Sequence, residues 1–195
     1  MYKIINYSQL ENHEMYDNQI IDLFDLTLGK GIVDDDWLHS IRSTSSYRYT
    51  DLVLAINSDV LLGTGSYSKI NTSQIPHYQS EILYYKPDFK FLSNEFGLLE
   101  NIGVYPQYRK MGIGNVITQK RIVDLYEWEC KEIITQSWIA DKSNSSYNIL
   151  LKNGFQPIVT IENYYYEDSL AWGFSCPNCG EPPCKCSAIF MYKKC

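Results

Sequence analysis

The sequence predicts one α/β domain, and three observations support this fold class. With 195 residues, 45% of them hydrophobic, the chain has the length of one domain and enough apolar residues for a sizeable core. Segments with the pattern of strands alternate with segments of near-helical spacing. A glycine-rich turn at residues 109–114 joins an apolar strand to a helix. We therefore expect a sheet flanked by helices.

The N-terminal part of the chain predicts one strand and two helices. Residues 2–7 have strand character, and residues 14–28 carry apolar side chains at near-helical spacing until two glycines follow. Residues 34–36 are three consecutive aspartates, which are typical of a helix N-cap region. We expect them to begin a second, short helix.

The middle of the chain predicts a hairpin, then a region without clear periodicity, and then a buried strand. Residues 52–56 and 60–67 have strand character and flank the turn Asn57-Ser58-Asp59. Residues 71–95 contain two prolines and no clear period, so we expect an insertion or a long loop there. Residues 98–104 predict a buried strand that ends before a proline.

The C-terminal half predicts two helices and three strands. Residues 113–130 contain neither proline nor glycine after Gly114 and predict a helix. Four of its residues are expected on one buried face: Val116, Val123, Tyr126 and Cys130. The remaining segments follow in the order strand, helix, strand, strand: 133–139, 144–153, 155–166 and 187–193.

The turn Arg109-Lys110-Met111-Gly112-Ile113-Gly114 has the properties of a phosphate site. Gly112 and Gly114 have no side chains where backbone N–H groups must approach an anion closely. The N-terminus of the following helix adds partial positive charge and N–H groups without helical partners. This combination suits the pyrophosphate of a bound cofactor, and an ordinary tight turn is the alternative.

Residues 102–114 resemble the acetyl-CoA-binding motif of the GNAT acetyltransferase superfamily. In that motif an apolar strand ending in Val is followed by a short turn containing Pro and then by Arg/Gln-x-x-Gly-x-Gly/Ala. Residues 144–155, which run into Gly154-Phe155, resemble the second motif of the family, and the resemblance covers residues 98–193. It implies a GNAT-like mixed central sheet, splayed between its two central strands and flanked by helices, in the family's order of elements.

The resemblance implies that residues 1–195 form one acetyl-CoA-dependent N-acetyltransferase domain that acts by direct attack in a ternary complex. The acceptor would be a primary amine: a protein or peptide N-terminus, a lysine side chain or a small amine. No cysteine near the cofactor motif has an obvious nucleophile setting, which argues against a covalent acyl-enzyme. The alternative is a catalytically degenerate GNAT scaffold that acts as a zinc-stapled protein-binding module.

The resemblance also assigns residues to the cofactor. The backbone of Ile102, Gly103 and Val104 would hold the pantetheine arm of acetyl-CoA. The pyrophosphate would lie on the turn that follows, where the expected cofactor-binding residues are Arg109, Lys110, Met111, Gly112, Ile113, Gly114 and Asn115. In the second motif, Asn144 is expected to contribute, although it stands one residue beyond the family's asparagine position.

Two residues are expected to carry the proton transfers. Glu100 lies four residues before Val104, so strand alternation places both on the same side. The family often uses acidic residues near this position on the substrate ammonium, so Glu100 is the candidate general base. A carboxylate satisfied by a neighbouring strand or loop is the alternative. Leu150 stands where many members have an acid tyrosine, which leaves Tyr147, one turn earlier, as a candidate acid or a core residue.

Residues 162–166, Glu-Asn-Tyr-Tyr-Tyr, resemble a segment of the ribosomal-protein alanine N-acetyltransferase branch. The resemblance implies that Tyr164 and Tyr165 contact an incoming peptide substrate. A glutamate of that branch, on the strand before the second motif, is not matched here, because Trp138 or Ile139 occupies its place. Tyrosines on an ordinary half-buried strand are the alternative.

Four cysteines, Cys176, Cys179, Cys184 and Cys186, lie within eleven residues. The C-x-x-C-G segment suits zinc because glycine lets backbone N–H groups turn toward a thiolate. Four thiolates complete a tetrahedral site without an open position. We expect structural Zn²⁺ in a small four-cysteine knuckle at residues 174–187, and metal-free thiols or a redox pair are the alternatives. Placed between the last two strands of a GNAT-like sheet, it would lie beside the substrate entrance and shape the choice of acceptor.

Composition narrows the class of partner and the location. The net charge of −6 argues against nucleic acid, and no apolar run approaches the roughly 20 residues of a membrane span. The first residues lack the apolar core of a signal peptide, so we expect a cytoplasmic protein. An acidic surface either attracts cationic amines or only keeps the protein soluble. The expected partners are acetyl-CoA and an amine acceptor, and the oligomeric state stays open.

Overall fold

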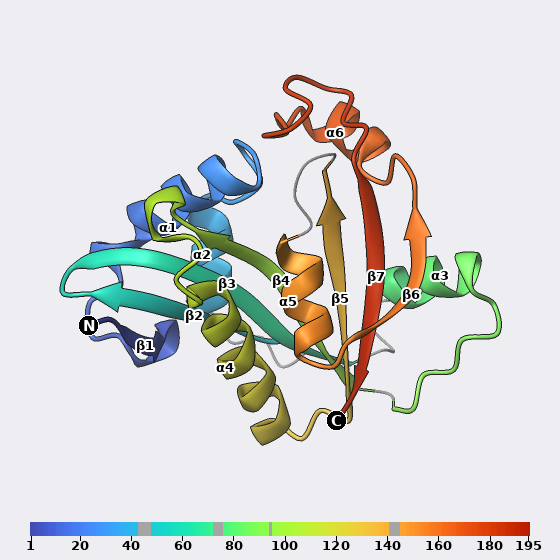
Figure 1. Ribbon diagram of the computed structural model, residues 1–195, viewed down its shortest axis with the longest axis horizontal. Helices are drawn as coiled ribbons and strands as arrows, with labels where there is room; N and C mark the ends of the chain where they lie inside the picture. The colour runs from blue at the N-terminus through green and yellow to red at the C-terminus, as the bar shows by residue number, and fades with distance from the viewer. Residues whose placement is uncertain (43–47, 72–75, 94, 141–144) are drawn as a thin grey trace.

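The computed structural model describes residues 1–42, 48–71, 76–93, 95–140 and 145–195. These residues form an α/β fold around a seven-stranded sheet of order β1-β2-β3-β4-β5-β7-β6 (Figure 1). Neighbouring strands are antiparallel except β4 and β5, which are parallel, so the sheet is mixed as the sequence predicts. The strands are β1 (Lys3–Asn6), β2 (Arg48–Asn57), β3 (Val60–Asn71), β4 (Glu95–Val104), β5 (Glu132–Ile139), β6 (Gln156–Ile161) and β7 (Ser187–Lys194).

Six α-helices and two short 3-10 helices lie in the described residues. The α-helices are α1 (Glu14–Thr27), α2 (Asp35–Arg42), α3 (Pro76–Tyr85), α4 (Ile113–Glu127), α5 (Ser145–Lys152) and α6 (Tyr166–Trp172). The 3-10 helices are η1 (Tyr7–Gln9) and η2 (Pro106–Tyr108). No helix within these described ranges is long and apolar enough to cross a membrane.

Side-chain alternation along β2 shows which helices cover which face of the sheet. Leu52 and Leu54 pack with apolar residues of α1 and α2, whereas Val53 and Ala55 pack with α4. Because successive side chains of a strand point to opposite faces, α1 and α2 cover one face and α4 covers the other. α5 lies on the α4 face, since its Leu150 belongs to the same core cluster as α4.

Several local expectations from the sequence are confirmed. β2 and β3 form a hairpin around Asn57-Ser58-Asp59, with Ser58 at φ +54°. The Trp37 N–H donates to Asp34 Oδ1 at 2.8 Å, so this aspartate caps the start of α2. Four cysteines lie between β6 and β7, where the knuckle is expected.

Two segments differ from the expectation. Residues 71–95 contain α3, with Ile82 fully buried, instead of a long loop. Pro76 is the first residue of this helix, where proline needs no backbone N–H. β6 is shorter than the expected strand 155–166, because Asn163 has φ +54° and the chain then enters α6.

The buried face of α4 also differs from the expectation. The sequence predicts Val123 and Tyr126 on this face, but their side chains are 47% and 40% exposed. The helix instead buries Arg121 and Asp124 together with its aliphatic residues. Cys130, which was expected on the same face, is buried, so apolar spacing identifies this face only in part, because two charged side chains occupy core positions.

Candidate functional site

The parallel strands β4 and β5 separate after a short stretch of pairing. Their pairing covers residues 97–99 of β4 and 133–135 of β5. Beyond it, β4 continues beside β3 to Val104, and β5 continues beside β7 to Ile139. The two strands diverge in Figure 1, with α5 beside the divergence. The sheet is therefore split between its central strands, as the resemblance implied.

The edge of β4 that faces this split presents backbone N–H groups. The Tyr105 N–H donates to Leu62 O on β3 at 3.0 Å. Because the direction of hydrogen bonding alternates along a strand, the N–H groups of Ile102 and Val104 face the side that β5 has left. Arg109 Nε donates to Val104 O at 3.1 Å, at the end of the same edge. This edge suits a ligand arm with its own amide groups.

A β-bulge in β4 lies next to the split. Ser66 of β3 stands opposite two residues of β4, Glu100 and Asn101. The Asn101 N–H donates to Ser66 Oγ at 3.2 Å. Arg121 Nη1, from α4, donates to the carbonyl oxygens of Ser66 and Asn101 at 3.0 and 3.3 Å. The guanidinium thus satisfies carbonyl groups at the point where the bulge interrupts the ladder.

Arg121 is the largest fully buried side chain of the described residues, and the sequence pattern does not single it out. Gly65 on β3 leaves room for it, since a Cβ at Gly65 would lie 3.0 Å from Arg121 Cζ. Burial lowers the pKa of Arg121 to about 9, while the charge of Glu100 acts in the opposite direction. An arginine at helical spacing between Ile117 and Leu125, both fully buried, is the signal that would have found it.

The bulge directs Glu100 to the face opposite the one expected. Ile102 and Val104 pack into the core on the α4 side, as does Tyr67. Glu100 Oε2 accepts a hydrogen bond from Ser68 Oγ at 2.9 Å, and Ser68 alternates with Tyr67. The expectation that Glu100 and Val104 share a side is therefore wrong, because one inserted residue reverses the alternation. The half-buried Glu100 carboxylate faces the side of the sheet that carries α1 and α2.

The turn before α4 has the backbone geometry of an anion-binding site. Lys110 and Gly112 have φ values of +64° and +81°, and a Cβ at Gly112 would meet no atom within 4 Å. The first bond of the helix runs from the Val116 N–H to Gly112 O. The N–H groups of residues 113–115 therefore precede the helical ladder, where the helix dipole favours negative charge.

α5 contacts α4 directly behind this turn. Asn153 Nδ2 donates to Asn115 Oδ1 at 2.9 Å. A Cβ at Gly114 would lie 3.3 Å from Ile149 Cδ1, so the two helices approach closely here. The side chain of Asn115 is therefore used between the helices, and its backbone N–H is the part directed to the turn.

The second motif holds the candidate acid Tyr147, the candidate cofactor residue Asn144, and Leu150 in place of the family's tyrosine. Leu150, at the family's tyrosine position, is buried in the core. Tyr147 is half-buried and packs against the same cluster, on the α4 side of the sheet. Asn144 lies outside the described residues.

The two tyrosines expected at the substrate site lie in the turn before α6. Tyr164 Oη donates to Glu81 Oε2 at 2.9 Å and accepts from Gln136 Nε2 at 2.7 Å. Burial and the neighbouring Glu81 raise the pKa of Tyr164 well above its usual range. Tyr165 packs against the cysteine cluster. Tyr164 thus ties α3 to β5, a contact that the sequence pattern does not indicate.

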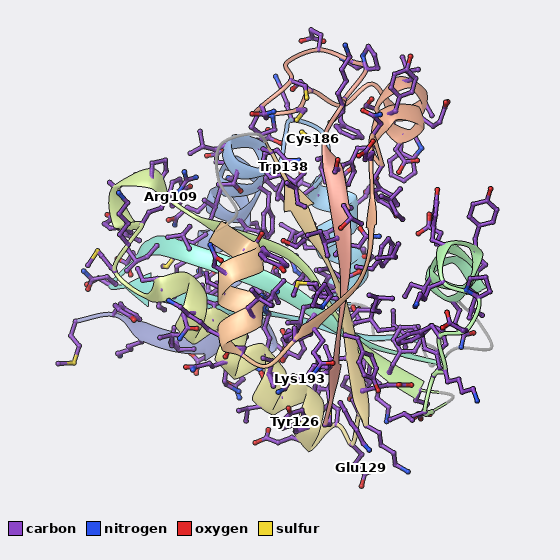
Figure 2. All side chains as sticks on the ribbon, turned by 45° about the vertical axis from the view of Figure 1, so that its right-hand side comes forward. Arg109, Tyr126, Glu129, Trp138, Cys186 and Lys193 are labelled. Atoms are coloured by element: carbon purple, nitrogen blue, oxygen red, sulfur yellow. The ribbon has the colours of Figure 1, made fainter. Side chains whose placement is uncertain are left out.

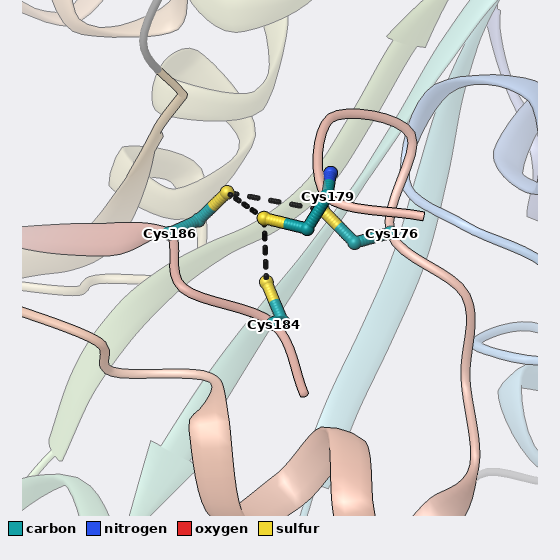
Figure 3. Close-up of side chains that lie close together, drawn as sticks. All are labelled: Cys176, Cys179, Cys184 and Cys186. Atoms are coloured by element: carbon teal, nitrogen blue, oxygen red, sulfur yellow. Dashed lines mark hydrogen bonds between the residues drawn. The ribbon is translucent and has the colours of Figure 1, made fainter. Parts of the chain in front are cut away.

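The four cysteines are brought together as free thiols between β6 and β7 (Figure 3). Their Sγ atoms lie within 4.8 Å of one another. Three of the separations are 3.8 Å (Cys176–Cys186), 3.5 Å (Cys179–Cys186) and 4.0 Å (Cys179–Cys184). Zinc–sulfur bonds of about 2.3 Å in a tetrahedral site give sulfur separations of about 3.8 Å. The cluster therefore has the size of a four-cysteine metal site.

Backbone N–H groups point at the sulfurs in the way the C-x-x-C-G segment predicts. Those of Asn178 and Cys179 donate to Cys176 Sγ at 3.4 and 3.5 Å. The Lys185 N–H donates to Cys179 Sγ at 3.4 Å and is the main reason that the pKa of Cys179 falls to about 7. Gly180 has φ +81° and pairs with Cys176 through two backbone bonds of 2.8 Å. These donors stabilise thiolates, which are the metal-binding form of cysteine.

The chain was compared with known proteins by sequence and by structure. No family model and no curated protein matches the sequence. Agmatine N-acetyltransferase matches with a TM-score of 0.67 and 12% identity over 100% of both chains. The ribosomal-protein-alanine N-acetyltransferase from Brucella melitensis matches with a TM-score of 0.64 and 15% identity over 99% of both chains.

A third solved structure is a GNAT family acetyltransferase from Elizabethkingia anophelis. It matches with a TM-score of 0.57 and 14% identity, over 100% of this chain and 98% of that one. Such low identities with nearly complete coverage establish a shared architecture. Together with the split between β4 and β5 and the turn before α4, they show that this chain has the fold of the GNAT N-acetyltransferases.

Proposed function

We propose that this protein is an N-acetyltransferase that moves the acetyl group of acetyl-CoA to a primary amine. The observation that carries the proposal is the continuous path from the split edge of β4 to the N-terminus of α4. Backbone N–H groups of Ile102 and Val104 would bind the pantetheine arm, and those of residues 110–115 would bind the pyrophosphate. The matched Elizabethkingia anophelis enzyme has acetyl-CoA bound, which supports the same use of this fold here.

The reaction needs a proton acceptor on the side from which the amine arrives. Glu100 faces the α1 and α2 side, and Ser68 Oγ holds its carboxylate at 2.9 Å. We assign Glu100 as the general base, which takes a proton from the acceptor ammonium directly or through water. The neutral amine then attacks the thioester carbonyl carbon, a C–N bond forms and the C–S bond breaks. The leaving thiolate takes a proton from Tyr147 or from solvent.

Tyr165 and the cysteine cluster are the features that we assign to contact with the acceptor. Two of the matched structures are named for different acceptors, ribosomal-protein alanine and agmatine. Tyr165 lies beside the cysteine cluster, near the end of β5, and is the tyrosine we assign to substrate contact. Tyr164 would act by positioning Tyr165, since their rings pack edge to face at 4.9 Å.

The test is product formation with a mixed set of acceptors. The protein is incubated with acetyl-CoA and N-terminal peptides, lysine peptides and small amines, and acetylated products are identified by mass spectrometry. We expect Glu100→Gln to lower kcat/KM by about 10²- to 10⁴-fold, the usual contribution of a general base. Glu95→Gln is the matched control, because Glu95 lies on the same strand but forms an exposed ion pair with Lys69 at 2.8 Å.

The same experiment separates this proposal from a second candidate function. Leu150 occupies the family's tyrosine position and is buried, which favours a degenerate scaffold that acts as a protein-binding module. A scaffold would give no product with any acceptor and no binding of acetyl-CoA. Binding of acetyl-CoA that Glu100→Gln leaves unchanged, with product lost, supports the enzyme. Equal activity of Glu100→Gln and the unaltered chain would refute the assignment of the base.

We also propose that the four cysteines bind one structural Zn²⁺. The sulfur separations, the N–H groups directed at Cys176 and Cys179, and the free thiols all fit a closed tetrahedral site. When bound, the ion would join the two ends of the segment between α6 and β7. Elemental analysis of the purified protein should find one zinc per chain. Cys130→Ser should keep the metal, because Cys130 is buried just after α4, away from the cluster.

A further inference from the structure

The cysteine cluster stands at the wide end of the split between β4 and β5. Cys186 is the residue before β7, and Ser187 at the start of β7 pairs with Ile139 at the end of β5. Trp138 packs against the cluster. Figure 2 shows Trp138 and Cys186 next to one another at this end of the sheet, away from Arg109 on the turn before α4. The cluster is therefore anchored to the β5 side of the split.

The segment before the cluster reaches the β4 side of the same split. A Cβ at Gly29, just after α1, would lie 2.0 Å from the carbonyl oxygen of Ser175. Backbone thus packs directly on backbone there, and Ser175 immediately precedes Cys176. α1 in turn rests on β4, because a Cβ at Gly103 would lie 2.7 Å from Thr27 Oγ1. The end of α1 therefore connects the cysteine segment to β4.

A third contact fixes the base of the segment. The Cys184 N–H donates to Ser169 Oγ at 2.8 Å, and Ser169 on α6 is fully buried. Phe174, half-buried, packs against the cysteines from the same segment. The fold therefore positions residues 174–187 through α6 and β7, and the close approach at Ser175 joins them to the end of α1.

We propose that the zinc-bound knuckle, residues 174–187, is a clamp that bridges the two sides of the split and forms the acceptor wall of the active site. The acceptor role rests on the proposed function, whereas the clamp rests on geometry. Its contact with the end of α1 lies on the α1 and α2 face, the face to which Glu100 is directed. Zinc would hold Cys176, and with it Ser175, against Gly29. Loss of the metal would free the end of α1 and open the acceptor side, while the turn before α4 stays intact.

The first test needs no enzyme activity. Hydrogen–deuterium exchange is compared between the zinc-loaded chain and the same chain after treatment with a chelator. We expect removal of zinc to speed exchange in residues 174–187 and also in residues 26–33, at the end of α1. Exchange in residues 109–116, at the turn before α4, should stay the same. Absence of zinc from the purified chain, or unchanged exchange in residues 26–33, would overturn the clamp.

A second test uses a pair of glycine variants that differ in their contact with the knuckle. Gly29→Ala inserts a Cβ where Ser175 O lies, whereas Gly31→Ala, at φ +85°, adds one where no atom lies within 4 Å. We expect Gly29→Ala to keep its zinc and its affinity for CoA but to raise the KM for the acceptor at least tenfold. Gly31→Ala should leave all three unchanged. Equal KM values for the two variants would contradict the clamp.

The two proposals fail in different ways. If the zinc-dependent change at residues 26–33 is found but no acceptor is acetylated and acetyl-CoA does not bind, the clamp stands and the enzyme assignment is wrong. If products form while removal of zinc changes neither exchange at α1 nor acceptor KM, the enzyme stands and the clamp is wrong. Cobalt(II) exchanged into the chain gives a further check, since four thiolates should produce the strong visible absorption of a tetrahedral site.

Discussion

Gly112 lies in the turn before α4, which we propose binds the pyrophosphate of acetyl-CoA. Gly112 has φ +81°, and a Cβ there would meet no protein atom within 4 Å. Replacement by alanine therefore adds backbone strain and places a methyl group in open space on the turn that precedes the N–H groups of residues 113–115. The strain of a left-handed alanine is about 1–2 kcal/mol. For a domain of this size it should lower Tm by about 2–8 °C.

The loss of affinity for CoA should be larger than this backbone strain alone predicts. A hydrogen bond to a charged group contributes about 1.5–3 kcal/mol, so the loss of one N–H contact to the pyrophosphate corresponds to about a 10- to 150-fold weaker affinity for CoA. Isothermal titration with CoA measures the affinity, and urea unfolding of the same samples measures the stability. Both quantities are needed, because a destabilised fold also loses ligand.

Gly173→Ala is the matched control for this variant. Gly173 ends α6 at φ +69°, and a Cβ there also meets no atom within 4 Å. It should therefore lose similar stability and keep its affinity for CoA. Wild-type affinity in Gly112→Ala would refute the proposed phosphate site. Equal loss of affinity in both variants would show that strain, and not the position of the methyl group, weakens binding.

Two further predictions concern buried charged side chains. Glu132 is fully buried and accepts hydrogen bonds from the Leu92 and Ser93 N–H groups at 2.9–3.1 Å. Glu132→Ala leaves these two donors without an acceptor. It should therefore lower the free energy of unfolding, measured by urea titration, by about 2–4 kcal/mol. Glu132→Gln, which keeps one acceptor, should lose less than half as much, and equal losses would contradict this role. Arg121→Met removes donors from two bulge carbonyls and should lower CoA affinity together with stability, by about 1–3 kcal/mol in unfolding. An affinity for CoA unchanged by Arg121→Met would show that the bulge does not depend on its guanidinium.

The glycine turn before α4 and the cysteine cluster were predictable from the sequence because their backbone and side-chain requirements are local. A backbone position at φ +81° favours glycine, and a four-cysteine site needs closely spaced cysteines such as the C-x-x-C-G segment. Both requirements concern residue types within a few positions, so they can be recognised in the sequence. The order of the other helices and strands was predictable for a similar reason, since each element carries its own period, but neither α3 nor α6 was expected. Pro76 shows the limit of such signals: a residue type that ordinarily breaks regular structure begins α3.

The face to which Glu100 points was not predictable, because a bulge is a property of two strands. Alternation along β4 alone places Glu100 with Val104, but Ser66 on β3 stands opposite two residues and reverses the order. The strand predicted over residues 155–166 is too long for a related reason. The tyrosines of residues 162–166 have high strand propensity, but the chain turns at Asn163. At Glu100 the deciding factor is the pairing with Ser66, which is distant in the sequence. At residues 162–166 it is the backbone conformation of Asn163 alone.

Arg121 connects the two halves of the proposed site. It lies in the core on the α4 side, as does the turn before α4, and it donates to the carbonyl groups of the bulge that directs Glu100 to the opposite side. In the proposed site, this buried cation would place the cofactor and Glu100 on the two faces of one strand. Donor and acceptor would then approach through opposite faces of the split and meet at residues 100–104. Burial of this charge costs stability, and its hydrogen bonds to the two bulge carbonyls offset part of that cost, at a position where the apolar pattern of α4 would place an aliphatic residue.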